Sequence, residues 1–154
     1  MTWYVFFLFL HIFAALLAFG TAMLAFPFMG AFASREPEHL NFALRLRYAL
    51  GRRAVTPLAA ITLALGIVLI VLGHWDLFGD QWLLISIILF VVMVGEAQLL
   101  TLPAVGRLVE LTGSPDAESS SEVANLLRKM RVAGVFSSLL LASIILLMVW
   151  KPGS

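Results

Sequence analysis

The chain has 154 residues, of which 62% are hydrophobic and 12% are charged, and its formal net charge is +1. Soluble domains carry about a quarter charged residues and have too little interior at this size for so much apolar surface, so the composition excludes an ordinary water-soluble fold. The chain has no cysteine, which excludes disulfides, thiol nucleophiles and thiolate metal sites.

Four apolar segments follow one another along the chain, and each is long enough to cross the hydrocarbon core as a helix, which takes about 20 residues. They cover residues 3–26, 55–73, 82–103 and 132–150. Because lipid offers no partner for an unpaired backbone amide, each segment is expected to be helical. The sequence therefore predicts an all-α fold, an integral membrane four-helix bundle that forms a single transmembrane domain over residues 1–154.

Lysine and arginine are concentrated in two of the three predicted loops. The loops before residue 55 and after residue 103 are basic, whereas the loop at 74–81 has no lysine or arginine. Since cytoplasmic loops carry the excess of positive charge, we expect two basic cytoplasmic loops and both termini outside. Four tryptophans are then expected at the outer interface: Trp3, Trp75, Trp82 and Trp150. This pattern suits a bacterial inner (plasma) membrane.

Local patterns predict how some helices begin. Residues 40–48 have an amphipathic spacing of four, typical of a short helix on the inner leaflet. The pair Thr56 and Pro57 is typical of a helix start, so the second span is expected to begin there. Ser119 followed by Glu122 has capping-box spacing, which predicts that the fourth helix begins well before the membrane.

Glu96 is one of two ionisable residues deep inside the apolar segments. Thr21, Thr62 and Ser138 are expected near the same depth from the helical rise, so the four side chains are expected to form one polar layer. One interpretation is a neutral Glu96 that is hydrogen-bonded across helices. The alternatives are a proton or cation relay and a role in binding a partner.

His11 is the other ionisable residue at depth. It lies about 12 Å below the outer surface if the first helix begins at Trp3. Small residues on its face, Ala14, Ala15 and Ala18, leave space beside the ring. A neutral imidazole with room for a flat macrocycle is what an axial haem ligand needs, so His11 is a candidate metal ligand. The structural alternative is a histidine hydrogen-bonded to a polar neighbour such as Ser143.

Two short segments resemble a known superfamily. Residues 8–12 read Leu-Phe-Leu-His-Ile ahead of small residues, and residues 149–152 read Val-Trp-Lys-Pro at the end of the fourth segment. A histidine early in the first helix and a Lys-Pro pair closing the fourth resemble the small integral membrane proteins of the copper-resistance D-like superfamily. One branch has no assigned function, and another is the oxygen-independent protoporphyrinogen oxidase of haem synthesis, which binds haem b.

The resemblance implies that His11 and Lys151 belong to one cofactor-binding site, with haem b as the expected cofactor. Residues 18–23 lack the tryptophan and the charged residues found in the oxidase branch. The resemblance therefore favours the branch without an assigned function.

Three functions follow from these features. The first is a haem b-binding, redox-linked membrane protein, based on His11 and Lys151. The second is a non-catalytic accessory subunit of a larger membrane complex, because the intramembrane polar residues are few. The third is a small ion or proton transporter that acts as a homo-oligomer, based on Glu96. The expected partners are the lipid bilayer and other membrane subunits or a second copy, and no nucleic acid.

Overall fold

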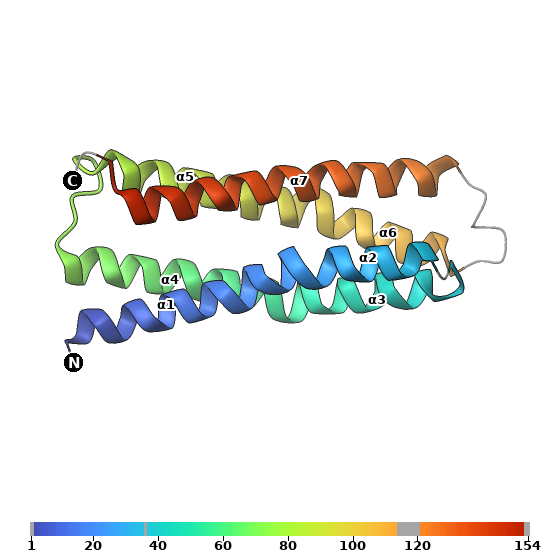
Figure 1. Cartoon of the computed structure of the whole chain (residues 1–154), viewed down its shortest axis with the longest axis horizontal. Coiled ribbons are helices and arrows are strands. Elements are labelled where there is room, and N and C mark those ends of the chain that lie inside the picture. The colour runs from blue at the N-terminus through green and yellow to red at the C-terminus, as the bar shows by residue number, and fades with distance from the viewer. Residues whose placement is uncertain (1, 36, 114–120, 153–154) are drawn as a thin grey trace.

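The computed structural model describes residues 2–35, 37–113 and 121–152, and the regular structure in these ranges is helical throughout. Four long helices cross the molecule from end to end (Figure 1). In chain order they consist of α1 (Trp3–Gly20), η1 (Thr21–Ala25) and α2 (Phe26–Arg35); α3 (Leu40–Leu50), η3 (Gly51–Val55) and α4 (Thr56–Gly73); α5 (Gln81–Glu96), η4 (Ala97–Thr101) and α6 (Leu102–Leu111); and α7 (Ser121–Trp150), with a short 3-10 turn, η2 (Pro37–His39), ahead of α3. Each is long and apolar enough to span a membrane, which confirms the predicted four-helix membrane bundle.

Three of these helices contain a π-helical turn, and each π-turn ends two residues before a proline. The turns η1, η3 and η4 precede Pro27, Pro57 and Pro103. Proline has no backbone N–H, and its ring collides with the carbonyl group four residues earlier. In each case that carbonyl belongs to the middle residue of the π-turn. A π-turn replaces the i→i+4 hydrogen bonds of the α-helix by i→i+5 bonds at this point. Each of the three helices therefore continues past its proline.

The same prolines explain where the sequence-based helix boundaries are wrong. Thr56 and Pro57 do not start a helix, because α3, η3 and α4 form one helix from Leu40 to Gly73. The Thr56 hydroxyl donates a hydrogen bond of 2.9 Å to the Gly51 carbonyl within that helix. The amphipathic segment 40–48 is therefore an extension of the second helix rather than a separate surface helix.

The other boundaries shift in the same direction. The first helix continues to Arg35 and the third to Leu111, beyond the ends expected at residues 26 and 103. The fourth helix begins at Ser121, well before residue 132, as predicted. The capping residue proposed for it, Ser119, lies outside the described residues.

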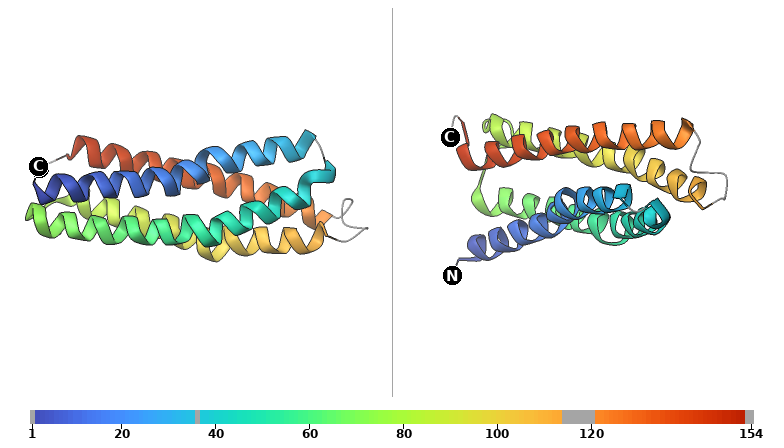
Figure 2. Two further views of the ribbon diagram at one scale, coloured as in Figure 1. Left: turned by 90° about the horizontal axis from the view of Figure 1, so that it is seen from below. Right: turned by 45° about the vertical axis from the view of Figure 1, so that its right-hand side comes forward.

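The bundle has two halves that differ in packing. The start of α1 and the end of α7 lie at one end of the bundle, and the end of α6 and the start of α7 lie at the other, together with η2 (Figure 1). The basic residues expected in two loops lie mostly in helices, because α3, η3, α6 and α7 extend into those segments: Arg45, Arg47, Arg52, Arg53, Arg107, Arg128, Lys129 and Arg131. We call residues 3–20, 56–96 and 138–150 the terminal half, and residues 26–35, 37–50, 102–111 and 121–136 the loop half. In the terminal half α1 packs against α4 and α5 against α7, and the two pairs stand apart (Figure 2, right).

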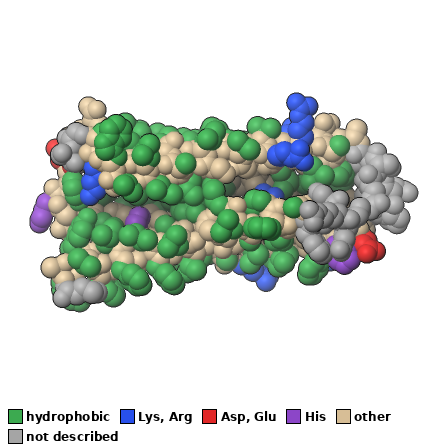
Figure 3. Space-filling model, in the orientation of Figure 1, with side chains coloured by type: hydrophobic (Ala, Val, Ile, Leu, Met, Phe, Trp, Pro, Cys, Tyr) green, Lys and Arg blue, Asp and Glu red, His purple; other side chains and the backbone are tan. Residues whose placement is uncertain are grey.

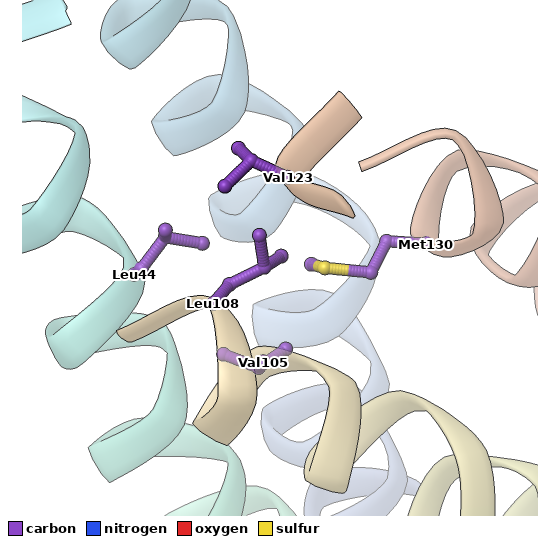
Figure 4. Packing of buried hydrophobic residues seen from close by; sticks show 5 residues of the cluster. All are labelled: Leu44, Val105, Leu108, Val123 and Met130. Carbon is purple, nitrogen blue, oxygen red and sulfur yellow. The ribbon is translucent and has the colours of Figure 1, made fainter. Parts of the chain in front are cut away.

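The loop half is closed by a hydrophobic cluster of side chains from three helices. Its members point toward one another (Figure 4): Leu44, Val105, Leu108, Val123 and Met130. The Asn41 side-chain amide adds hydrogen bonds of 2.9 Å to the Val109 carbonyl and to the Thr112 hydroxyl. These contacts hold α3, α6 and the start of α7 together.

Candidate functional site

A cavity of about 800 Å³ lies between the two helix pairs of the terminal half. Its walls come from α1, α4, α5 and α7 and are mainly aliphatic and aromatic. A few polar side chains interrupt them: Tyr4, His11, Thr62, Trp75, Trp82, Ser86 and Lys151. This size, and an apolar wall with a few polar groups, are typical of a small-molecule or cofactor site.

The cavity opens to the surface between α1 and α7. Ile12 and Leu16 of α1, together with Ile145 and Val149 of α7, line the cavity and are also exposed. Figure 3 shows this face, with a histidine side chain in the hollow between the two helix layers. In a membrane this surface borders the acyl chains, so a ligand can reach the cavity from the bilayer.

His11 projects from α1 against the backbone of α4. Its Nδ1 lies 2.9 Å from the Thr62 carbonyl oxygen. A carbonyl only accepts hydrogen bonds, so Nδ1 carries the proton and Nε2 carries the lone pair. A Cβ atom at Gly66 would lie 3.2 Å from His11 Cε1, so the glycine is what lets the imidazole approach α4 closely.

The polar neighbour named as an example for His11, Ser143, is not its partner, because His11 bonds the Thr62 carbonyl instead. The Ser143 hydroxyl donates to the Leu139 carbonyl of its own helix at 2.9 Å. The three alanines near His11 differ in their surroundings. Ala15 lines the cavity, whereas Ala14 and Ala18 are buried.

Lys151 ends α7 in an unusual conformation. Its φ is 45°, in the left-handed region, and its N–H donates to the Leu147 carbonyl at 2.9 Å. Its Nζ lies 4.6 Å from the ring centroid of Trp75 and 5.5 Å from that of Trp82. The two indoles meet edge to face, with centroids 5.4 Å apart. All three side chains line the cavity, so the structure brings His11 and Lys151 to the walls of one cavity.

The four tryptophans do not share one environment. Trp3 and Trp150 are exposed at the two ends of the chain, as expected for interfacial rings. Trp82 is 6% exposed and packs inward against Trp75. Trp82 is therefore part of the cavity wall.

Glu96 lies at the junction of α5 and η4, where it joins several helices. The Thr101 hydroxyl donates to Oε1 at 2.5 Å, and the Ser137 hydroxyl of α7 donates to Oε2 at 2.8 Å. Arg47 of α3 interacts electrostatically with Glu96, and its guanidinium lies 4.9 Å from the ring centroid of Phe26. The carboxyl group thus has two hydroxyl donors and a nearby cation.

The other members of the predicted polar layer do not join Glu96. The hydroxyls of Thr21, Thr62 and Ser138 donate instead to carbonyls of their own helices, those of Leu17, Leu58 and Gly134.

The residues that do contact Glu96 were missed for identifiable reasons. Thr101 is five positions from Glu96 and comes within reach through the π-turn, and Ser137 is one position from the serine that the depth argument selected.

Two further cavity residues were missed by the sequence analysis. Ser86 is 1% exposed, and its hydroxyl donates to the Trp82 carbonyl at 2.7 Å. Gly66 follows Thr62 by one helical turn, so the two share a face of α4. No sequence signal links Gly66 to His11, because the contact between His11 and α4 follows only from the structure.

These features define a small multi-pass membrane protein with an apolar cavity between its helices. Residues 5–152 match the family described as predicted integral membrane protein (DUF2269), and the chain belongs to that family. No curated protein and no solved structure matches the chain. The family description states membrane integration, in agreement with the four apolar helices.

Proposed function

We propose that this protein binds haem b in the cavity of the terminal half, with His11 as an axial ligand, and that it acts as a redox-linked membrane protein. The observation that carries the proposal is the hydrogen bond between His11 Nδ1 and the Thr62 carbonyl. It selects the tautomer whose Nε2 has a free lone pair. Histidines that ligate metals almost always donate their other ring N–H to an acceptor of this kind.

The surroundings of His11 suit a flat apolar macrocycle. The cavity has a volume of about 800 Å³ and mainly apolar walls, and Gly66 keeps the imidazole close to α4. Haem iron is already held by the nitrogens of its macrocycle, so an axial site needs little from the protein beyond one imidazole. A bare metal ion would need several side chains, and the described residues contain no group of three or more His, Cys, Asp or Glu.

The chain's own residues have separate roles in this site. The Thr62 carbonyl orients the imidazole and increases its basicity as a ligand. The apolar walls exclude water and lower the local dielectric, which influences the reduction potential. Bound haem would supply one-electron chemistry.

The sequence resemblance supports the same site. The copper-resistance D-like superfamily implies a shared cofactor site for His11 and Lys151, and both residues line this cavity. The distribution of basic residues further leads us to place the protein in a bacterial inner membrane, with both termini outside.

The first experiment is an absorption spectrum of mildly purified protein, produced with ample haem and recorded before and after dithionite reduction. We expect a Soret band at close to one haem per chain and its loss in His11→Ala. The matched control is His74→Asn, which changes a histidine outside the cavity walls at a left-handed position that asparagine tolerates. A folded wild-type protein without haem bands, or a band that survives in His11→Ala, would contradict the proposal.

The two other functions give different results. An accessory subunit would co-purify with other membrane proteins at fixed stoichiometry after gentle extraction. The transporter alternative is based on the Glu96 cluster, and it requires proton or ion flux in liposomes that decreases in Glu96→Gln. Flux that is insensitive to this change would exclude that role for Glu96.

A further inference from the structure

The bundle is longer than the hydrocarbon core of a membrane is thick. Its four helices have 29 to 34 residues, and at about 1.5 Å per residue they are about 44–51 Å long. The hydrocarbon core is about 30 Å thick, and an average tilt of about 20° shortens the projection of a helix by only a few ångström. About 10–20 Å of the bundle therefore extends beyond the hydrocarbon.

The charged residues show which part extends. Along the helices that end at Gly73 and Trp150, the first charged residue met from that end is an arginine in both cases. Arg53 precedes Gly73 by 20 residues, a rise of about 30 Å. Arg131 precedes Trp150 by 19 residues, a rise of about 28 Å. Both distances match the hydrocarbon thickness, so the two arginines lie at the phosphate level of one leaflet when these helix ends lie at the other.

Five exposed cations lie at or next to this level, and we call them the inner basic belt: Arg52, Arg53, Arg128, Lys129 and Arg131. Figure 3 shows Lys and Arg side chains over α7, to the right of a mainly hydrophobic stretch. In the part of the chain that the structure describes, the ion pairs of arginine join Arg107 to Glu110 and Glu122, and no described ion pair includes a residue of the belt. The positive charge of the belt is therefore not neutralised by a described acidic side chain.

The belt residues of α7 are crowded. Three of them lie within four positions, and Arg128 and Arg131 share a face because they are three residues apart. Like charges at such spacings destabilise a helix, whereas an anion bound between them offsets the repulsion. The guanidinium group is a planar fork that binds phosphate oxygens in pairs. Clusters of about four to eight Lys and Arg next to a membrane span are typical of binding to acidic lipids.

Beyond the belt the surface resembles that of a water-soluble protein. Side chains of both charges are exposed there: Arg45, Arg107, Glu110 and Glu122. Helices α3, α6 and α7 supply both these charges and the hydrophobic cluster of the loop half. Burial of apolar side chains in such a cluster stabilises a protein where the alternative is water, and much less where the alternative is lipid.

We propose that the inner basic belt binds the phosphate groups of acidic phospholipids in the cytoplasmic leaflet, and that the part of the bundle beyond the belt stands in water. The belt thereby sets the depth at which the bundle sits in the membrane. The inference shares the orientation of the chain with the proposed function, and it uses no residue of the cavity walls.

The first test uses the absence of cysteine from the chain, because a single introduced cysteine can then be labelled uniquely with a bimane fluorophore. The α7 reporter is Val135→Cys, which is 58% exposed and one turn from Arg131. The α4 reporter is Ala60→Cys, which is exposed and about two turns from Arg53. The full chain is reconstituted into phosphatidylcholine vesicles, and quenching by spin-labelled phosphatidylglycerol is compared with quenching by spin-labelled phosphatidylcholine.

We expect the acidic lipid to bind about fivefold more tightly than phosphatidylcholine at both reporters in low salt, the scale of one cation near an anionic membrane surface. Leu146→Cys is the matched control reporter. It is 59% exposed, and it lies 11 residues after Val135 on the same face of α7 but near the opposite leaflet. It should show no such preference.

Two variants with equal loss of charge serve as controls for each other. Arg128→Gln/Arg131→Gln should reduce the preference to less than about twofold at the α7 reporter and leave it unchanged at the α4 reporter. Arg52→Gln/Arg53→Gln should do the reverse. Arg128→Lys/Arg131→Lys should retain most of the preference, because the charge remains. Circular dichroism shows whether each variant is folded.

Three results would overturn the lipid site. They are equal binding of the two lipids at both reporters of the otherwise unchanged chain, a preference that survives in the variant next to its reporter, and a loss at both reporters in both variants, which would reflect net charge alone. Inorganic phosphate at constant ionic strength should leave the preference unchanged. Its loss under these conditions would assign the belt to a soluble anion instead.

A second measurement tests the depth of the bundle. Phe42→Cys and Leu139→Cys replace side chains of similar exposure, 67% and 63%, in the loop half and the terminal half. In lipid nanodiscs, where both membrane faces are accessible, a charged maleimide should label Phe42→Cys rapidly and leave Leu139→Cys unlabelled. Equal protection of the two would place the loop half in lipid and overturn the inference. Neither measurement involves the cavity, so the haem proposal is judged separately from the His11 spectra.

Discussion

The loop half and the terminal half contain the same four helices, yet one is filled and the other is hollow. In the loop half Leu108 is fully buried and Val105 nearly so. In the terminal half the helix pairs are separated by a cavity of about 800 Å³. Within lipid, apolar side chains gain little from facing one another rather than acyl chains, so helix association depends on close packing and polar contacts. The contacts that join one helix pair to the other can thus be concentrated in the loop half, while the terminal half keeps space for a ligand.

The largest loss of stability is expected from Glu96→Ala, at the boundary between the halves. The change leaves the Thr101 and Ser137 hydroxyls without their acceptor and leaves Arg47 without a nearby anion, so we expect a decrease in unfolding free energy of about 3 kcal/mol. Glu96→Gln keeps an acceptor oxygen and should remain closer to wild type. Unfolding in mixed micelles measures both, and a Glu96→Ala variant as stable as wild type would show that this cluster does not join the helices.

A somewhat smaller difference should separate two leucines. Leu108→Ala removes a side chain packed on all sides and should destabilise the protein by about 2–3 kcal/mol. Leu83→Ala makes the same change at a buried side chain that already borders the cavity, and its cost should be less than half as large. The same micelle titration compares them. Equal losses would mean that the terminal half is as tightly packed as the loop half.

Gly66→Ala is expected to affect binding more than stability. The added methyl group would lie 3.2 Å from the His11 ring and displace it from α4, whereas alanine favours helix by about 1 kcal/mol relative to glycine. We expect near-normal unfolding and a reduced haem occupancy. Gly95→Ala is the control, because its added Cβ meets no atom within 4 Å beyond its chain neighbours and the backbone of its own helix. Full occupancy in Gly66→Ala would separate His11 from the proposed site.

The smallest change in stability is expected for Lys151→Asn. Asparagine relieves a left-handed strain of about 1 kcal/mol and loses a cation–π contact of similar size. The unfolding midpoint should therefore stay close to that of wild type, as chemical unfolding in mixed micelles would measure. A large destabilisation would mean that Lys151 supports the fold of the terminal half.

The sequence was sufficient for the fold class and for the helix ends near the chain termini, because long apolar segments have one stable solution in lipid. It was misleading at Pro57, which was interpreted as the start of a helix although a π-turn carries the helix through it. Arg47 was counted with the loop charges, so its proximity to Glu96 was not anticipated.

The site was only partly predictable for a chemical reason. His11 was identified because an ionisable side chain at membrane depth is rare. Its partner is the main-chain carbonyl of Thr62, and every residue carries such a group. No side-chain pattern singles out one carbonyl, so that contact required the three-dimensional arrangement of α1 and α4.

Helix α7 contains no internal proline and no π-turn, so its side chains keep a regular angular spacing around the helix axis from Ser121 to Trp150. Its three buried residues, Val123, Met130 and Ile144, are separated by multiples of seven, and Ser137, which contacts Glu96, lies midway between the last two. One further step of seven leads to Lys151. The hydrophobic cluster, the Glu96 junction and the end of the cavity thus lie along a single stripe. Inserting one residue before Ser137 would rotate everything beyond it by about 100°, whereas the other three helices can absorb such a change by losing or gaining a π-turn.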